Sequence, residues 1–256
     1  MRRPIIAGNW KMNKALAEAE TLALGIVEKF KETNVDIILC PPFTALQKVG
    51  EICKGSPIFL GAQDLFYEEN GPWTGEISAS QLIDIGCKYV IIGHSERRQI
   101  FKEDDIIINK KIKQALKHNL SPIFCVGETE KQRKEGREKE IVERQIRLGL
   151  KDIDLTFRIL NSKFRIPLVI AYEPVWAIGT GNTCKSEDAE KMHIFIRNLI
   201  SELYTKDLGD VMRILYGGSV KPDNIDAIMK MPNIDGCLVG GCSLDVSSFC
   251  RIIEFR

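Results

Sequence analysis

The chain has 256 residues, 44% of them apolar, and its 36 basic and 35 acidic residues give a formal net charge of +1. The length fits one large domain or two small ones, and the apolar fraction supports a substantial core. The balanced charge argues against nucleic-acid and membrane-surface partners, so any site for an anion must be local.

Eight cysteines are scattered along the chain without C-x-x-C spacing, and several lie inside apolar runs. They are typical of reduced core residues, so we expect an intracellular, cytoplasmic protein. The histidines, His94, His118 and His193, are far apart in sequence, and we expect no metal site. The first eleven residues contain too few apolar side chains for a signal peptide or a membrane span.

Short runs rich in β-branched residues recur along the chain and predict strands. They begin near Ile5, Val35, Ile58, Tyr89, Ile123, Leu168, Val211 and Cys237. Apolar stripes with helical period lie between them, for example from Leu16 to Phe30 and from Met192 to Leu203. Ser186, followed by two acids, predicts an N-cap for the second of these helices. The charge-rich stretch 128–143 is typical of a solvated helix face.

Strands that alternate with helices predict parallel βαβ units. Eight such units in this length favour a closed (β/α)8 barrel, an α/β fold with eight parallel strands ringed by helices, as a single domain over residues 1–256. A doubly wound sheet is the alternative. The segment Gly8–Asn9–Trp10–Lys11 after the first strand is not the G-x-G-x-x-G fingerprint of that fold.

Glu173 closes an apolar run, 168–171, that lacks polar alternation and is typical of a strand buried on both faces. The carboxyl ends of parallel strands face the ligand crevice, so we expect this acid where substrates bind. A loop bounded by proline and rich in glycine follows it and could move over it. The plain alternative is a solvated acid at a strand end.

Strand ends of a barrel converge on one mouth. The first strand delivers Asn9 and Lys11, with Trp10 turned away by the two-residue period, and the fourth delivers His94. With Glu173, these groups predict proton transfer next to a carbonyl, in which a base takes a carbon-bound proton while cations and donors stabilise the enolate oxygens. Taken singly, they could be a turn residue, a surface lysine and a satisfied buried histidine. The prediction depends on their convergence.

Paired glycines follow the seventh and eighth strands, Gly217–Gly218 before Ser219 and Gly240–Gly241. Backbone N–H groups can approach an anion closely at such positions, so the two pairs predict a phosphate site. A tight turn is the alternative for either pair alone.

These segments resemble the triosephosphate isomerase family in order and spacing, over essentially the whole chain. The resemblance is carried by Asn9–Trp10–Lys11, Gly61–Ala62–Gln63, Thr74–Gly75–Glu76, Gly93 to Arg98, Ala171 to Gly181, Tyr216 to Val220 and Val239–Gly240–Gly241. It implies a (β/α)8 TIM barrel that interconverts dihydroxyacetone phosphate and D-glyceraldehyde 3-phosphate through an enediolate, in glycolysis and gluconeogenesis, without a cofactor.

The resemblance also implies a role for each site residue. Glu173 would move the proton between two carbons, and His94 would polarise the carbonyl and shuttle protons on oxygen. Lys11 would balance the charge of the enediolate, Asn9 would orient the substrate, and Glu96 would pair with Lys11. The phosphate would be held by backbone N–H groups of Gly179, Ser219, Gly240 and Gly241.

A lid and a dimer are implied in the same way. The lid would comprise Pro174, Val175, Trp176, Ala177, Ile178, Gly179, Thr180, Gly181, Asn182 and Thr183. The segment from Gln63 to Glu76 is long for such a loop and carries aromatic residues, Trp73 among them, that a monomer would expose. The resemblance implies that it enters a second subunit and brings Thr74 to that subunit's mouth, giving a homodimer. The alternative is a loop folded back on its own barrel.

The chain departs from the family pattern at several positions. Asp64 stands where Asn is usual, Cys242 where Ala is usual, and residues 182–186 differ from the common end of the lid. Residues 151–165 exceed the usual length, and we expect an added surface helix or loop there.

The alternatives to an isomerase are an aldolase or lyase barrel and a non-catalytic relative. An aldolase or lyase barrel would need a Schiff-base lysine within a middle or late strand, and strands five to eight contain none. A non-catalytic relative would be expected to lack Lys11, His94 or Glu173, and all three are present.

Overall fold

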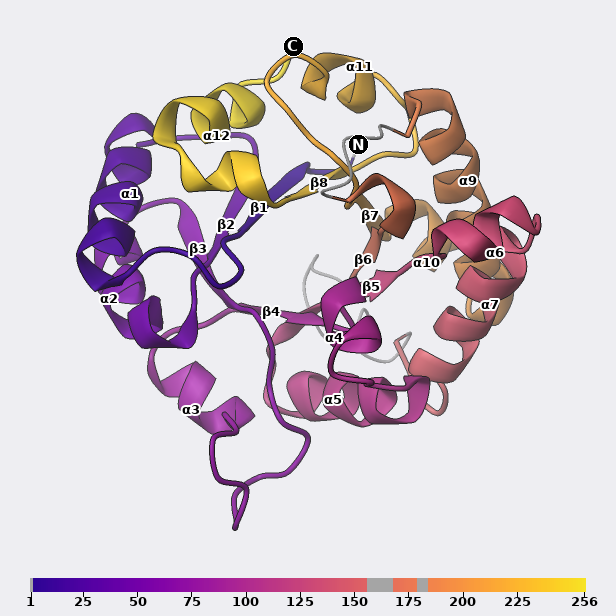
Figure 1. The fold of residues 1–256 in the computed structure, drawn as a ribbon, viewed down its shortest axis with the longest axis horizontal. Coiled ribbons are helices and arrows are strands. Elements are labelled where there is room, and N and C mark those ends of the chain that lie inside the picture. Colours follow the sequence, from indigo (N-terminus) through magenta and orange to yellow (C-terminus); the bar gives the residue numbers. More distant parts are fainter. Residues whose placement is uncertain (1, 156–167, 179–183) are drawn as a thin grey trace.

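The computed structural model describes residues 2–155, 168–178 and 184–256 (Figure 1). Eight parallel strands form a closed barrel in which each strand pairs with the next and β1 pairs with β8. The strands are β1 (Ile5–Asn9), β2 (Asp36–Cys40), β3 (Ile58–Ala62), β4 (Tyr89–Ile92), β5 (Ser121–Val126), β6 (Val169–Tyr172), β7 (Arg213–Tyr216) and β8 (Gly236–Val239). The predicted barrel is confirmed, and the doubly wound alternative was wrong.

Helices surround the barrel as an outer ring (Figure 1). The described helices are α1 (Leu16–Lys29), α2 (Phe43–Cys53), α3 (Ala79–Asp84), α4 (Ser95–Gln99), α5 (Asp105–Lys117), α6 (Glu130–Lys134), α7 (Glu138–Gly149), η1 (Val175–Ala177), α9 (Ser186–Leu203), α10 (Lys206–Val211), α11 (Ile225–Met229), η2 (Gly241–Leu244) and α12 (Val246–Ile253). The predicted added segment at 151–165 falls largely outside the described residues.

The core has two layers because successive strand residues point to opposite sides. On β1, Ile5 and Ala7 belong to the cluster inside the barrel, whereas Ile6 packs outward against the helices. The same parity continues past the strand. Asn9 reaches the mouth, and Trp10 is fully buried between barrel and helices, as predicted.

Two details of the predicted elements differ from the structure, although α9 begins at Ser186 as predicted. Val211 ends α10, and β7 begins at Arg213, whose Nη1 lies 2.8 Å from Oδ2 of Asp36. A single β-branched residue before a strand does not distinguish a helix end from a strand start. Lys185 rather than Ser186 is the N-cap of α9, without a side-chain cap, while the two acids do lie in the first turn.

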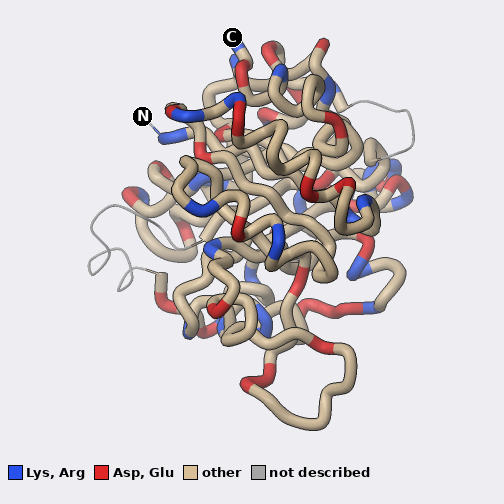
Figure 2. The backbone as a smooth tube through the Cα atoms, turned by 90° about the vertical axis from the view of Figure 1, so that its left-hand side faces the viewer, with Lys and Arg blue, Asp and Glu red and all other residues tan. Residues whose placement is uncertain are grey.

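Basic and acidic residues are interspersed along the backbone (Figure 2). Within the part of the chain that the structure describes, no helix is long and apolar enough to cross a membrane. All eight cysteines are free thiols, and all except Cys242 are buried. The prediction that they are core residues is confirmed for those seven.

Candidate active site

A pocket of about 290 Å³ lies at the carboxyl ends of the strands. Asn9, Lys11, His94 and Glu173 line one part of it, and the glycine-rich ends of β7 and β8 line the rest. The pocket therefore brings together the groups predicted for proton transfer and the groups predicted for phosphate. Glu96 is not among its lining residues and contacts the site through Lys11 and His94.

Glu173 is 2% exposed and is held by the start of α4, which follows β4. Its Oε2 accepts a hydrogen bond from the backbone N–H of Ser95 at 2.8 Å, and its Oε1 lies 3.0 Å from Nε2 of His94. A carboxylate in this position is withdrawn from water and faces the substrate pocket. The hydrogen bond from Ser95 was not predicted, although the residue directly follows His94 in the sequence.

Glycines flank Glu173 on both neighbouring strand ends. A Cβ on Gly127, after β5, would lie 1.8 Å from the backbone O of Glu173. A Cβ on Gly217, after β7, would lie 2.8 Å from Cγ of Glu173. Neither position has room for a side chain, so Glu173 occupies space that the two glycines leave open.

His94 presents a defined nitrogen to the pocket. Its Nδ1 accepts the backbone N–H of Glu96 at 3.2 Å, which places the ring proton of the neutral imidazole on Nε2, the atom next to Glu173. The preceding Gly93 has φ +74, and Arg98 donates to its carbonyl O at 2.8 Å. This turn aims the Nε2–H donor of His94 into the pocket, beside Oε1 of Glu173.

Lys11 has a left-handed backbone, φ +53, which is strained for a residue with a side chain. Its N–H donates to Oδ1 of Asn9 at 3.0 Å, and Nε2 of Gln63 donates to its carbonyl O at 2.8 Å. Its Nζ lies 2.7 Å from Oε1 of Glu96. Gln63, predicted only as part of the dimer loop, thus also holds the backbone of its own barrel's lysine.

The other part of the pocket suits an anion. A Cβ on Gly241 would meet nothing within 4 Å, and one on Gly240 would meet only Cε of Lys11 at 3.6 Å. These glycines therefore leave open space beside a cation, and η2 begins at Gly241 with its first N–H groups at the pocket. Ser219 lines the same part. Gly179, the remaining predicted phosphate ligand, lies outside the described residues.

The described part of the predicted lid, Pro174 to Ile178, contains η1 and rests on Glu128. Nε1 of Trp176 donates to Oε1 of Glu128 at 2.8 Å, and the hydroxyl of Tyr172 donates to both carboxylate oxygens at 3.1 Å. The rest of the predicted lid, residues 179–183, lies outside the described residues.

The prediction that residues 128–143 form one solvated face was wrong at Glu128, which is fully buried. Burial raises the pKa of its carboxyl, and the hydrogen bonds from Trp176 and Tyr172 oppose that rise. Glu128 is the first polar residue after the apolar run of β5, which could have revealed it, since the same rule located Glu173. The rest of the prediction holds, because α6 and α7 follow with Ile141, Val142 and Ile146 as the buried stripe.

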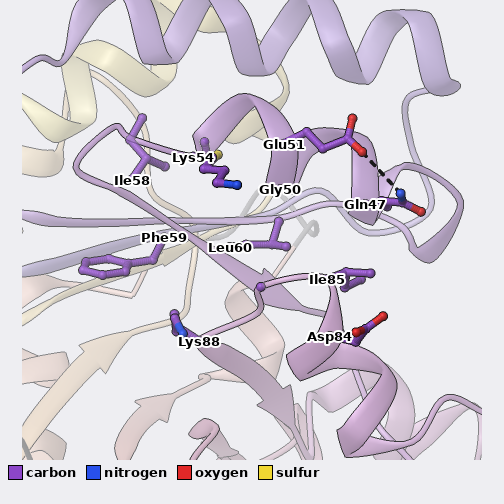
Figure 3. Close-up of a pocket in the computed structure, with 12 residues that line it drawn as sticks. Gln47, Gly50, Glu51, Lys54, Ile58, Phe59, Leu60, Asp84, Ile85 and Lys88 are labelled. Atoms are coloured by element: carbon purple, nitrogen blue, oxygen red, sulfur yellow. Dashed lines mark hydrogen bonds between the residues drawn. The ribbon is translucent and has the colours of Figure 1, made fainter.

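No group of three or more His, Cys, Asp or Glu side chains that could hold a metal ion is found in the described ranges. A larger hollow of about 500 Å³ lies at the opposite end of the barrel, between α2 and the amino ends of β3 and β4 (Figure 3). Its charged residues, Glu51, Lys54 and Lys88 among them, are exposed, and it contains none of the predicted site residues.

The fold and the pocket define a (β/α)8-barrel enzyme in which a paired carboxylate and imidazole and a lysine lie beside glycine-rich strand ends. The sequence model of the triosephosphate isomerase family matches residues 4–256. The chain belongs to that family and is an isomerase, as the resemblance implied.

Curated relatives agree over the full length. The chain is 52% identical over 255 residues to the triosephosphate isomerase of Finegoldia magna, covering 100% of this chain and 99% of that protein. It is 51% identical over 258 residues to that of Roseiflexus sp. (strain RS-1), with 100% and 98% coverage. It is 50% identical over 257 residues to that of Chloroflexus aurantiacus, with 100% coverage of both chains.

Proposed function

We propose that this isomerase interconverts dihydroxyacetone phosphate and D-glyceraldehyde 3-phosphate with Glu173 as the base. The observation that carries the assignment is the position of the buried Glu173 carboxylate, 3.0 Å from Nε2 of His94 and in the same pocket as Lys11. Glu173 removes a proton from one carbon and returns it to the neighbouring carbon. The reaction belongs to glycolysis and gluconeogenesis.

The other polar groups stabilise the charge that develops on oxygen. Nε2–H of His94 donates to the carbonyl oxygen and relays protons between the two oxygens. The Lys11 ammonium offsets the negative charge of the enediolate, and Asn9 orients the substrate. Glu96 keeps Lys11 paired from outside the pocket, supported by the 2.7 Å contact between them.

The phosphate group binds to backbone N–H groups of Ser219, Gly240 and Gly241, and to Gly179 when the lid closes. Pro174 to Thr183 form that lid, with Pro174 to Trp176 as its stiff first hinge, since proline restricts its own φ and the residue before it. Closure excludes water from the enediolate. Proton transfer of this kind needs no cofactor.

We also propose that two copies form a homodimer. The loop after β3 extends away from the barrel beside α3 (Figure 1). In it, Trp73 is 44% exposed, and Met12, directly after Lys11, is 95% exposed. Apolar side chains at a loop tip and beside a mouth favour burial in a second subunit, with Thr74 near that subunit's Asn9 and Lys11.

A cytoplasmic location fits the eight free thiols, and partners other than the substrate and a second copy are not expected from the interspersed charges (Figure 2). We further propose one domain over residues 1–256, supported by the pairing of β1 with β8, which closes the ring with both ends of the chain.

Replacing Glu173 tests the proposed base. Glu173→Gln keeps the size of the side chain and one oxygen that can accept from Ser95 N–H, but it cannot accept the proton, so turnover should fall by about 10²-fold or more while inhibition by inorganic phosphate is unchanged. Glu140→Gln, an exposed change on α7, is the matched control. A Glu173→Gln enzyme with nearly unchanged turnover contradicts the assignment.

A further inference from the structure

We propose that Gln145 is a positioning residue for the base and acts through Gly127, an inference that rests on the role of Glu173 proposed above. Gln145 lies on α7, outside the barrel, and is 5% exposed. It does not line the substrate pocket. Its influence on the reaction must therefore pass through the backbone that it contacts.

The side-chain amide of Gln145 holds both backbone groups of Gly127. The N–H of Gly127 donates to Oε1 of Gln145 at 2.8 Å, and Nε2 of Gln145 donates to the carbonyl O of Gly127 at 3.1 Å. All four atoms are buried in these bonds. Because buried backbone groups are costly without partners, the two bonds together fix the position and tilt of Gly127.

Gly127 lies directly against the backbone of the base. The β5–β6 ladder continues past both strands, since Glu173 N–H donates to Val126 O at 2.8 Å and Val175 N–H donates to Glu128 O at 3.1 Å. Gly127 stands between these two bonds, where even a Cβ would come within 1.8 Å of the Glu173 carbonyl O. A displacement of Gly127 therefore moves Glu173.

Packing alone does not hold Gly127 in place. A cavity of about 70 Å³ lies behind Glu173, and Gln145, Gly127 and Glu173 all line it, with Ser95 and Thr129. The packing around Gly127 is therefore incomplete on this side. The two hydrogen bonds with Gln145, together with the ladder bonds at Val126 and Glu128, oppose a shift of Gly127 into this space.

This arrangement predicts which kinetic constant responds. Loss of the Gln145 bonds changes the distance from the Glu173 carboxylate to the substrate carbon and to Nε2 of His94, now 3.0 Å. The backbone N–H groups proposed to bind the phosphate, at the ends of β7 and β8, do not contact Gly127. Proton transfer should slow, whereas substrate and phosphate binding should stay nearly constant.

The first variant is Gln145→Met, which keeps length and apolar volume but removes both hydrogen bonds. Its matched control is Gln114→Met on α5, another buried glutamine, which lines none of the cavities around the site. The measurements are kcat and KM for dihydroxyacetone phosphate, inhibition by inorganic phosphate, and the folded fraction by urea unfolding. The isotope effect on kcat is measured with substrate deuterated at the transferred position.

We expect kcat of Gln145→Met to fall about tenfold or more per folded molecule, with KM and phosphate inhibition within about threefold and a larger isotope effect. Gln114→Met should leave all of these nearly unchanged. A Gln145→Met enzyme whose kcat per folded molecule matches that of the control overturns the inference.

The second variant, Gln145→Glu, adds a pH readout that a purely structural role would not produce. The ionised carboxylate accepts from Gly127 N–H but repels Gly127 O, whereas the protonated carboxyl restores the donor. Its kcat relative to wild type should rise as the pH is lowered, and that of Gln145→Met should not. A constant ratio overturns the inference even if Gln145→Met does not fold.

The activities of the Glu173 and Gln145 variants distinguish an error in the role of Glu173 from an error in the role of Gln145. If Glu173→Gln stays active, the assignment of the base is wrong whatever Gln145 does. If Glu173→Gln is inactive and the Gln145 variants behave like the control, only the positioning role is wrong.

Discussion

Gly127→Ala is the smallest change that displaces the proposed base. Gly127 does not have a left-handed φ, so the obstacle to alanine is space rather than backbone strain. The new Cβ would start 1.8 Å from the carbonyl O of Glu173 and 2.6 Å from its carbonyl carbon, where a Cβ contact is essentially never under 3.0 Å. The two backbones must therefore separate by more than 1 Å.

The expected cost follows from that displacement. A reacting group misplaced by about 1 Å can cost about 10²-fold in rate, which corresponds to about 2.7 kcal/mol in the activation barrier. Overpacking should also lower the free energy of unfolding by about 1–3 kcal/mol. Because the contact is backbone against backbone, rotation of a side chain cannot relieve it.

The assay compares kcat and KM with the free energy of unfolding from urea titration. Gly149→Ala is the control, since its Cβ would meet Cζ of Phe124 on β5 at 2.4 Å without touching Glu173. We expect Gly127→Ala to lose kcat and the control to lose stability alone. A Gly127→Ala enzyme with kcat within about threefold of wild type would refute the reasoning that Gly127 sets the position of the base.

Three further predictions concern pH, the lid and assembly. Asp64 is buried against Lys111, Arg97 and Glu103, and burial, assisted by repulsion from Glu103 and opposed by the two cations, raises its pKa from 3.8 to about 6. The folded protein then binds this proton more tightly than the unfolded chain does. Wild type should therefore gain free energy of unfolding relative to Asp64→Asn as the pH falls from about 6 to 4, by at most about 3 kcal/mol, measured by urea unfolding. A difference that does not change with pH contradicts this prediction. Deleting residues 178–181 should slow isomerisation and raise the share of intermediate lost as methylglyoxal and phosphate. Asn182→Lys is the control and should change turnover only modestly. If the ratio of phosphate release to isomerisation is unchanged in the deletion variant, this segment is not a lid. Sedimentation should give a dimer at micromolar concentration for wild type and a weaker one for Trp73→Ser, and an active wild-type monomer would exclude the dimer.

The barrel and the main polar groups could be predicted because they follow from local rules. A strand buried on both faces has no polar alternation, and its first polar residue lies at the ligand end, which located Asn9 and Glu173. The same rule applied to Glu128 but was obscured by the charges that follow it in the sequence. Its carboxylate is bonded by Tyr172, which lies on the neighbouring strand β6, and by Trp176, which lies in η1.

The groups that hold the site could not be predicted in this way, because their contacts join distant parts of the chain. Gln145 meets Gly127 only through the placement of α7 against β5, and Gln63 meets Lys11 only through the barrel register. Neither contact leaves a periodic or spacing signal. Sequence therefore predicted the chemical groups of the site, and the structure was needed to identify their supports.

The hydrogen bonds around Lys11 also indicate what fixes the position of its side chain. Its ion pair with Glu96 is partly exposed on both sides, and pairs of that kind contribute little net stability. Its left-handed backbone, by contrast, is costly and persists only where the surroundings determine it. Asn9 and Gln63 supply those surroundings, one bonding its N–H and the other its carbonyl O. The position of the ammonium is therefore set mainly through the backbone, and the contact with Glu96 adds only a partner for its Nζ.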